Sequence, residues 1–205
     1  MDLSLYITAF VTLFVVIDPI GLAPIFIALT PGMDGSQRRL IGLRAVVIAA
    51  LLLMLFGLAG EAILSGIGIS ISAFRIAGGI LLFLTALDML FERRTERREG
   101  QGHAEPEAQD PSVFPLAMPL LAGPGALATM ILLVGQQPGW GHVVMVNLVM
   151  LVVLAIAMLL FHLATPLARA LGRTGVMVVT RLLGMLLAAL SVQFVIDGVN
   201  GTGLV

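Results

Sequence analysis

The residues best suited to chemistry stand together in an otherwise apolar stretch, VVIDPIGLAPIF, at positions 15–26. This stretch holds one carboxylate, Asp18, followed by Pro19, Gly21 and Pro24. Proline lacks a backbone N–H and clashes with the carbonyl one turn earlier, so the two prolines predict a helix that breaks and restarts after Pro24. A restarted helix presents free N–H groups and a partial positive charge at its first turn, where a carboxylate binds well.

A second stretch, MPLLAGPGALATMI at positions 118–131, repeats this pattern, with Pro119 and Pro124 at the spacing of the first pair. Gly123 and Gly125 flank its second proline, and glycine lets a ligand or a neighbouring backbone approach closely. Unpaired backbone groups are costly in hydrocarbon, so both breaks should face the protein interior or a polar cavity. We interpret the two stretches as sides of one small-solute site; the alternative is a pair of structural kinks that bind nothing.

The acid of the first stretch has two interpretations. Asp18 lies fifteen residues after Leu3, where the first apolar segment begins, and a charge at mid-membrane costs at least about 2.5–3.5 kcal/mol on insertion scales. Such a residue is functional by default: it could pair with a substrate ammonium, bind a coupling Na⁺ or take up H⁺. It could equally cap the restarted helix through a backbone N–H. Met118 occupies the corresponding place in the second stretch, and both interpretations stay open.

Uncharged polar residues in the apolar segments are weaker candidates. Thr129 lies in the second stretch, and Asn147, Ser191 and Gln193 are of the same type. Such side chains more often bond neighbouring helices, although a site for a neutral zwitterion would be lined by them. His162 is a lone imidazole without the companions that a metal site needs.

The composition of the chain indicates the environment in which these residues lie. Of the 205 residues, 59% are hydrophobic and 11% are charged, whereas soluble domains carry about 25% charged residues. Most of the chain is therefore expected to lie in a lipid bilayer. The net charge of −1 gives no argument for nucleic acid, and the lack of cysteine excludes thiolate chemistry. Motifs such as H-E-x-x-H, G-x-S-x-G and the phosphate-binding loop are missing, so we expect no enzymatic activity and no cofactor.

Six segments have the roughly 20 apolar residues that a membrane-crossing helix needs: 3–29, 41–64, 69–91, 113–134, 143–163 and 176–199. The first and fourth contain the proline motifs. Between the third and fourth lies the only clearly hydrophilic stretch, which is rich in charge, glycine and proline. We predict a first three-helix repeat at 1–91, a charged cytoplasmic linker at 92–112 and a second three-helix repeat at 113–205.

Charge orients these segments. All eleven basic residues are arginines, and nine of them fall in the three loops that share one side of a six-span bundle. These are Arg38, Arg39, Arg44, Arg93, Arg94, Arg97, Arg98, Arg169 and Arg173. The positive-inside rule places those loops in the cytoplasm and both termini on the outer side.

The two halves look like an inverted repeat. Besides the proline motifs, both share Arg-x-x-Gly followed by leucines, beginning at Arg75 and at Arg181. Three spans per repeat is an odd number, so the second copy must enter the membrane from the opposite face, as in many transporters. The sequence thus predicts an all-α integral membrane protein with six transmembrane helices in two inverted three-helix repeats, the first helix of each broken at a Pro-Gly motif. Arg75 and Arg181 either reach toward lipid head groups or form gating pairs, with Glu61 best placed to pair with Arg75.

Three motifs carry a family resemblance: FVVIDPIGLAPIF, GISISAFRIAGGI and VFPLAMPLLAGPGALATMI, at positions 14–26, 68–80 and 113–131. Together they closely resemble the MarC family, also described as six-span neutral amino acid transporters. The resemblance implies a multi-pass protein of the bacterial inner membrane, and some members are assigned transport of glycine, alanine and other neutral amino acids. The family often has Asn where this chain has Asp18.

Our interpretation is a secondary transporter that moves a small neutral solute by alternating access, coupled to Na⁺ or H⁺ if it is coupled at all. Its expected partners are the bilayer and the solute, with homo-oligomerisation left open. The alternatives are a passive channel for a small solute or ion, and a membrane scaffold or regulator that transports nothing.

Overall fold

A computed structural model describes residues 3–91 and 110–203, in which every regular element is a helix. Most of the predicted linker, at 92–109, lies outside the described residues. In chain order the helices are α1 (Leu3–Ile17), α2 (Pro19–Leu29), α3 (Gly35–Gly66), α4 (Ile71–Leu90), η1 (Ser112–Leu121), α6 (Pro124–Val134), α7 (Trp140–His162) and α8 (Ala164–Asn200).

The helices confirm the predicted membrane protein in outline. The pair α1–α2 and the helices α3, α4, α7 and α8 are long and apolar enough to cross a membrane. The pair η1–α6, bent by 52°, makes a sixth span if it is counted as one. Helix α8 extends beyond the predicted segment because it includes a first part that ends at Gly172, where φ is 61° and the chain changes direction.

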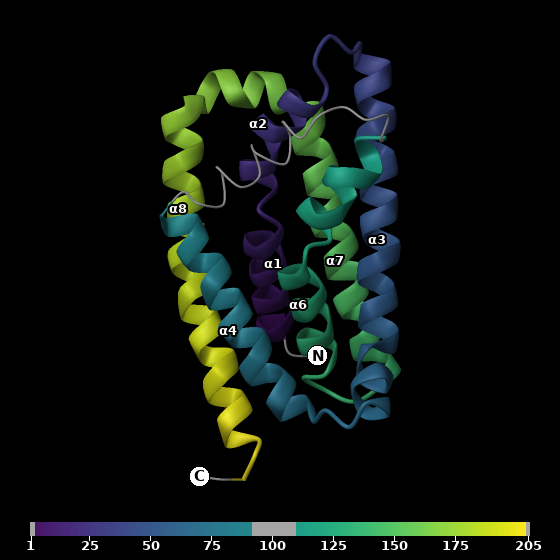
Figure 1. The fold of residues 1–205 in the computed structure, drawn as a ribbon, viewed down its shortest axis with the longest axis vertical. Coiled ribbons are helices and arrows are strands. Elements are labelled where there is room, and N and C mark those ends of the chain that lie inside the picture. Colours follow the sequence, from purple (N-terminus) through teal and green to yellow (C-terminus); the bar gives the residue numbers. More distant parts are fainter. Residues whose placement is uncertain (1–2, 92–109, 204–205) are drawn as a thin grey trace.

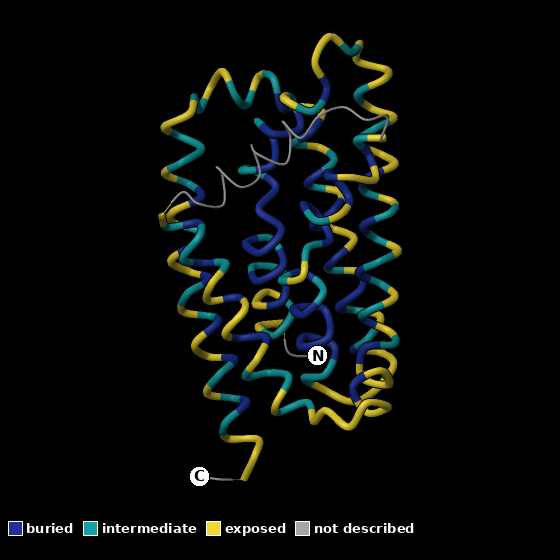
Figure 2. The backbone as a smooth tube through the Cα atoms, in the orientation of Figure 1, coloured by how far each residue is buried: buried dark blue, intermediate teal, exposed yellow. Residues whose placement is uncertain are grey.

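The broken spans lie inside the bundle, and the unbroken helices surround them. Figure 2 shows buried residues concentrated along α1, α2 and α6. Every residue of α6 from Ala128 to Val134 is buried. By contrast, α3 exposes large apolar side chains such as Leu51 and Leu55, as expected of a helix whose outer face meets lipid.

The outer helices pair closely where glycines allow it. Helix α4 packs against α8, and the two run in opposite directions (Figure 1). A Cβ placed on Gly79 would lie 2.8 Å from the carbonyl oxygen of Ser191, and one on Gly198 would lie 3.0 Å from that of Ser72. The backbones therefore approach more closely than any larger residue would allow, as is common between membrane helices.

The two ends of the bundle differ in charge. Helix α1 begins and α8 ends at the same end of the molecule (Figure 1). The starts of α3 and α8, with Arg38, Arg39, Arg44 and Arg169, lie at the opposite end. These four arginines, which the sequence assigns to one side of the membrane, thus lie at one end of the folded bundle.

Candidate functional site

The first break consists of a single residue, Asp18, between α1 and α2. Its backbone has φ 54° and ψ 61°, in the left-handed region that Asp and Asn tolerate better than other side chains. Its Oδ1 accepts a hydrogen bond from the N–H of Gly21 at 3.1 Å. Asp18 is therefore the N-cap of α2, and with 1% of its surface exposed it is buried in the bundle.

The residues after Asp18 explain this geometry. Pro19 takes the first position of α2, where a missing N–H costs nothing and the fixed φ suits a helix. Gly21 is required because a Cβ there would collide with the Asp18 carboxylate. Helix α2 continues through Pro24, so the predicted restart after Pro24 is wrong. The helix restarts at Pro19, five residues earlier, because this proline is already suited to begin it.

The second break is longer and less regular. Helix η1 contains Pro115 and Pro119 and has extended backbone angles at Phe114 and Met118. The chain then turns at Gly123, which has φ −74° and ψ 167°, and α6 begins at Pro124. The N-cap of α6, Gly123, has no side chain that could cap the helix. A Cβ on Gly123 would lie 2.6 Å from the carbonyl oxygen of Pro119, so the turn requires glycine.

The two breaks meet inside the bundle. A Cβ placed on Gly125 would lie 3.5 Å from Cγ1 of Val16, two residues before Asp18, and 3.7 Å from Oγ1 of Thr85 on α4. Thr129 is fully buried, and its hydroxyl donates to the carbonyl of Gly125 at 2.8 Å. Gly125, which Thr129 contacts, thus lies against the end of α1, beside the first break.

The breaks differ in exposure. Asp18 and Pro19 are buried, and Gly21 and Pro24 are half-buried. At the second break Pro119, Gly123 and Gly125 are half-buried, and Pro124 is exposed. The start of α6 is therefore more exposed than Asp18.

The far ends of the two short helices are held by arginines. Nη2 of Arg38 donates to the carbonyl of Thr30, which follows α2, at 3.2 Å. Nη2 of Arg75 donates to the carbonyl of Gly135, which follows α6, at 3.0 Å. Cations at helix C-termini are stabilised by the helix dipole. The structure thus gives Arg75 a carbonyl partner, whereas Glu61, its predicted partner, is exposed near the end of α3.

His142, a buried residue of α7 that lies beside the end of α6, was not identified from the sequence. Nε2 of His142 lies 2.8 Å from the carbonyl oxygen of Leu133, and Nδ1 lies 3.4 Å from the hydroxyl of Tyr6. His142 therefore connects α7 with α6 and α1. No sequence signal identifies it, because its partners depend on which helices become neighbours. His162, which the sequence does single out, is exposed and bonds the carbonyl of Met158.

Arg181 is exposed on α8, with the backbone of α4 nearby at Gly184. Within the described ranges, no group of three or more His, Asp or Glu side chains could hold a metal ion.

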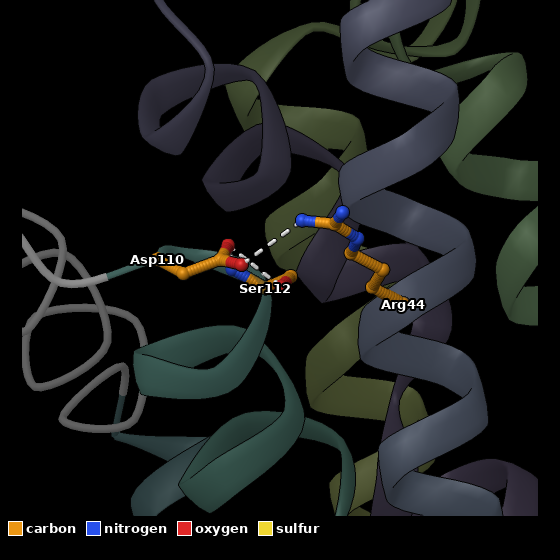
Figure 3. A network of polar contacts seen from close by, with 3 residues as sticks. All are labelled: Arg44, Asp110 and Ser112. Atoms are coloured by element: carbon orange, nitrogen blue, oxygen red, sulfur yellow. Dashed lines mark hydrogen bonds and ion pairs between the residues drawn. The ribbon is translucent and has the colours of Figure 1, made fainter.

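A surface network holds the start of η1 (Figure 3). Oδ1 of Asp110 accepts hydrogen bonds from the backbone N–H and the hydroxyl of Ser112, at 3.0 and 2.7 Å. Oδ2 forms an ion pair with Arg44 of α3 at 3.3 Å. The hydrogen bonds from Ser112, followed by the charge of Arg44, lower the pKa of the Asp110 carboxyl below its ordinary value.

These features define a multi-pass α-helical membrane protein with two interrupted spans whose breaks meet in its interior. The chain belongs to the MarC family of integral membrane proteins, which it matches over residues 3–202. It is 42% identical to a UPF0056 membrane protein of Archaeoglobus fulgidus over 96% of this chain and 92% of the relative. Identity is 37% to one of Methanocaldococcus jannaschii, over 98% of each chain. Identity is 35% to the UPF0056 membrane protein YhcE of Escherichia coli K12, over 98% of this chain and 94% of the relative. No solved structure matches the chain.

Proposed function

We propose that the protein is a secondary transporter of small neutral solutes, such as glycine and alanine, that works by alternating access. One observation carries the proposal: the breaks of two interrupted spans meet inside the bundle, with a buried carboxylate at one of them. Interrupted helices at this depth are the usual place where transporters bind substrates and coupling ions, because their free backbone groups are tolerated only in protein or beside water.

We further propose that the halves 1–91 and 113–205 form an inverted repeat. Helix α3 packs against α7 and α4 against α8, so each unbroken helix contacts its counterpart in the other half. In Figure 1 both pairs run in opposite directions. An inverted repeat would produce this pairing, and it would also place the arginine-held ends of α2 and α6 at opposite ends of the bundle.

Within this site the two helix starts would have different tasks. The Asp18 carboxylate already occupies the start of α2. The start of α6 has no side-chain cap, so it is the better place for the carboxylate of a neutral amino acid. Asp18 would then face the amine or a coupling Na⁺ or H⁺.

The proposed location is the inner membrane, with the bundle oriented by its arginines. The end with Arg38, Arg39, Arg44 and Arg169 would face the cytoplasm, and both termini would lie on the outer side. Because the protein contains no cysteine, its orientation can be tested with a single introduced cysteine. A cysteine that replaces Thr202 should react with an impermeant thiol reagent added to intact cells. Reaction only after the cells are opened would reverse the orientation.

The function is tested by counterflow in liposomes that contain the purified protein. Radiolabelled glycine or alanine should accumulate in vesicles preloaded with the unlabelled amino acid, and the exchange should saturate. Linear, non-saturating flux would indicate a channel instead. A lack of flux, together with no ligand-dependent rise in melting temperature, would favour a scaffold or regulator.

Substitution of Asp18 tests the site. Asp18→Ala should abolish counterflow, because it removes both the cap and the charge. Asp18→Asn keeps an N-cap oxygen, so it should retain exchange and change the dependence on Na⁺ or pH. Full transport by the Asp18→Ala protein would rule out this site.

A further inference from the structure

Asn147 lies within the span formed by α7 and has an unused hydrogen-bond acceptor. It is the eighth residue of α7, about 10 Å along the helix from its start at 1.5 Å per residue. Its side chain is 8% exposed. Among the described residues, no donor lies within hydrogen-bonding distance of its Oδ1.

The orientation of the amide is fixed by its other end. Nδ2 of Asn147 donates to the carbonyl of Val143, one turn earlier, at 2.8 Å. Reversing the amide would bring two oxygens together, so the acceptor must point away from α7. A buried acceptor without a partner is costly, and most buried polar groups in native proteins have one. Oδ1 of Asn147 therefore calls for a donor from outside the protein.

The neighbours of this oxygen are a glycine of α3 and a methionine of α6. It faces Gly57 on α3, where a Cβ would lie 3.6 Å from Oδ1 and 2.9 Å from Cε of Met130. The terminal methyl of Met130, on α6, thus lies beside the same glycine as the amide. Methionine is unbranched and flexible, so the buried side chain of Met130 is the neighbouring group that must change rotamer to admit a solute.

The position along α6 connects this place to the breaks. Met130 follows Thr129, whose hydroxyl bonds the carbonyl of Gly125 at the second break. Further along α6, His142 holds the carbonyl of Leu133. The amide of Asn147 thus lies between the breaks and the end of the bundle where α1 begins.

We propose that Asn147 contacts the transported solute as it passes between the breaks and the end of the bundle where α1 begins, with its Oδ1 accepting a hydrogen bond from the solute's ammonium group when Met130 moves off Gly57. This inference rests on the proposed transport of neutral amino acids and adds a second contact to it. The site takes a small N–H donor, since the amide oxygen is a hydrogen-bond acceptor.

The test compares two variants that each remove an unpartnered polar group. Asn147→Leu replaces the amide by an apolar side chain of similar size. Thr180→Val is the matched control, because the buried Oγ1 of Thr180 on α8 likewise has no partner among the described residues. Each variant should raise the melting temperature of the ligand-free protein by about 2–4 °C. Only Asn147→Leu should raise the half-saturating glycine concentration in counterflow, by roughly tenfold or more.

Every other result counts against the inference. Wild-type half-saturation in Asn147→Leu would overturn it while leaving the transport function intact. So would an equal change in Thr180→Val. A lower melting temperature in Asn147→Leu would mean that the amide is satisfied within the folded protein itself. If wild-type protein exchanges neither glycine nor alanine, the proposed function fails and this inference fails with it.

Discussion

The two breaks share a proline spacing but not a chemistry. The first is one residue long, buried, and closed by its own carboxylate, with Asp18 bonded to Gly21. The second occupies several residues around Gly123, is partly exposed at Pro124, and has no side-chain cap on the helix that follows. The N-cap of α2 is thus an anion, whereas the N-cap of α6 is a glycine.

This difference gives the two halves separate roles in the proposed mechanism. An anion at a helix start is stabilised by the free N–H groups and by the helix dipole. Because Asp18 already provides that anion to α2, a substrate carboxylate gains more at α6. The halves of an inverted repeat need not stay chemically equivalent, and here the first would bind the cation and the second the anion of a zwitterion.

The largest expected effect comes from Gly21→Ala. The added methyl group would collide with the Asp18 carboxylate, so the cap must break or the helix start must shift. Overpacking and the lost cap together should cost about 2–4 kcal/mol of unfolding free energy. Thermal melting in detergent measures this loss, and counterflow should fall with it.

The matched substitution at the second break is Gly125→Ala. Its Cβ would make ordinary contacts at 3.5–3.7 Å with Val16, Leu82 and Thr85, so the expected change in stability is below about 1 kcal/mol. Equal melting temperatures for the two alanine variants would contradict the claim that only the first break is closed by a side chain.

The Asp18 series should have the next largest effect on stability. Asp18→Ala loses the cap and places alanine in the left-handed region, at a combined cost of about 1.5–3 kcal/mol. Asp18→Asn should stay within about 0.5 kcal/mol of wild type, since Asn tolerates the same backbone and caps equally well. A large loss of stability in the Asn variant would show that the charge itself holds the break in place.

The spans and the two breaks could be predicted from the sequence, whereas the exact helix start and the contacts between spans could not. Apolar segment length and proline spacing are local properties, so they identified the spans and the two interrupted ones. The sequence does not give the exact start of α2, because either proline of the first stretch can end a helix, and only the structure shows that Pro19 occupies the first turn. The partners of Arg75 and His142 could not be read at all, since they depend on how separate spans pack.

A smaller effect is expected at the far ends of the two short helices. Arg75→Ala removes a charged donor that joins α4 to the carbonyl after α6, and it should cost about 1–2 kcal/mol. Arg38→Ala removes the corresponding contact after α2, but Nε of Arg38 is buried without a partner among the described residues. Removing this unsatisfied group offsets part of the lost hydrogen bond, so the net cost should be below about 1 kcal/mol. Melting temperatures in the reverse order would contradict this assignment.

The smallest expected effect concerns Asp110, which caps the start of the second interrupted span. Its partner Arg44 is exposed, so Asp110→Asn should cost only about 0.2–1 kcal/mol near pH 7. Hydrogen bonds from Ser112 and the charge of Arg44 lower the pKa of this carboxyl. Its contribution is therefore fully present above the unfolded value of about 3.9 and is lost as pH falls through the folded value. The melting temperatures of wild type and variant should differ near neutral pH, converge at acidic pH, and approach each other in high salt as the ion pair is screened. A difference that persists at low pH would mean that the Asp110 charge does not hold this end of the span.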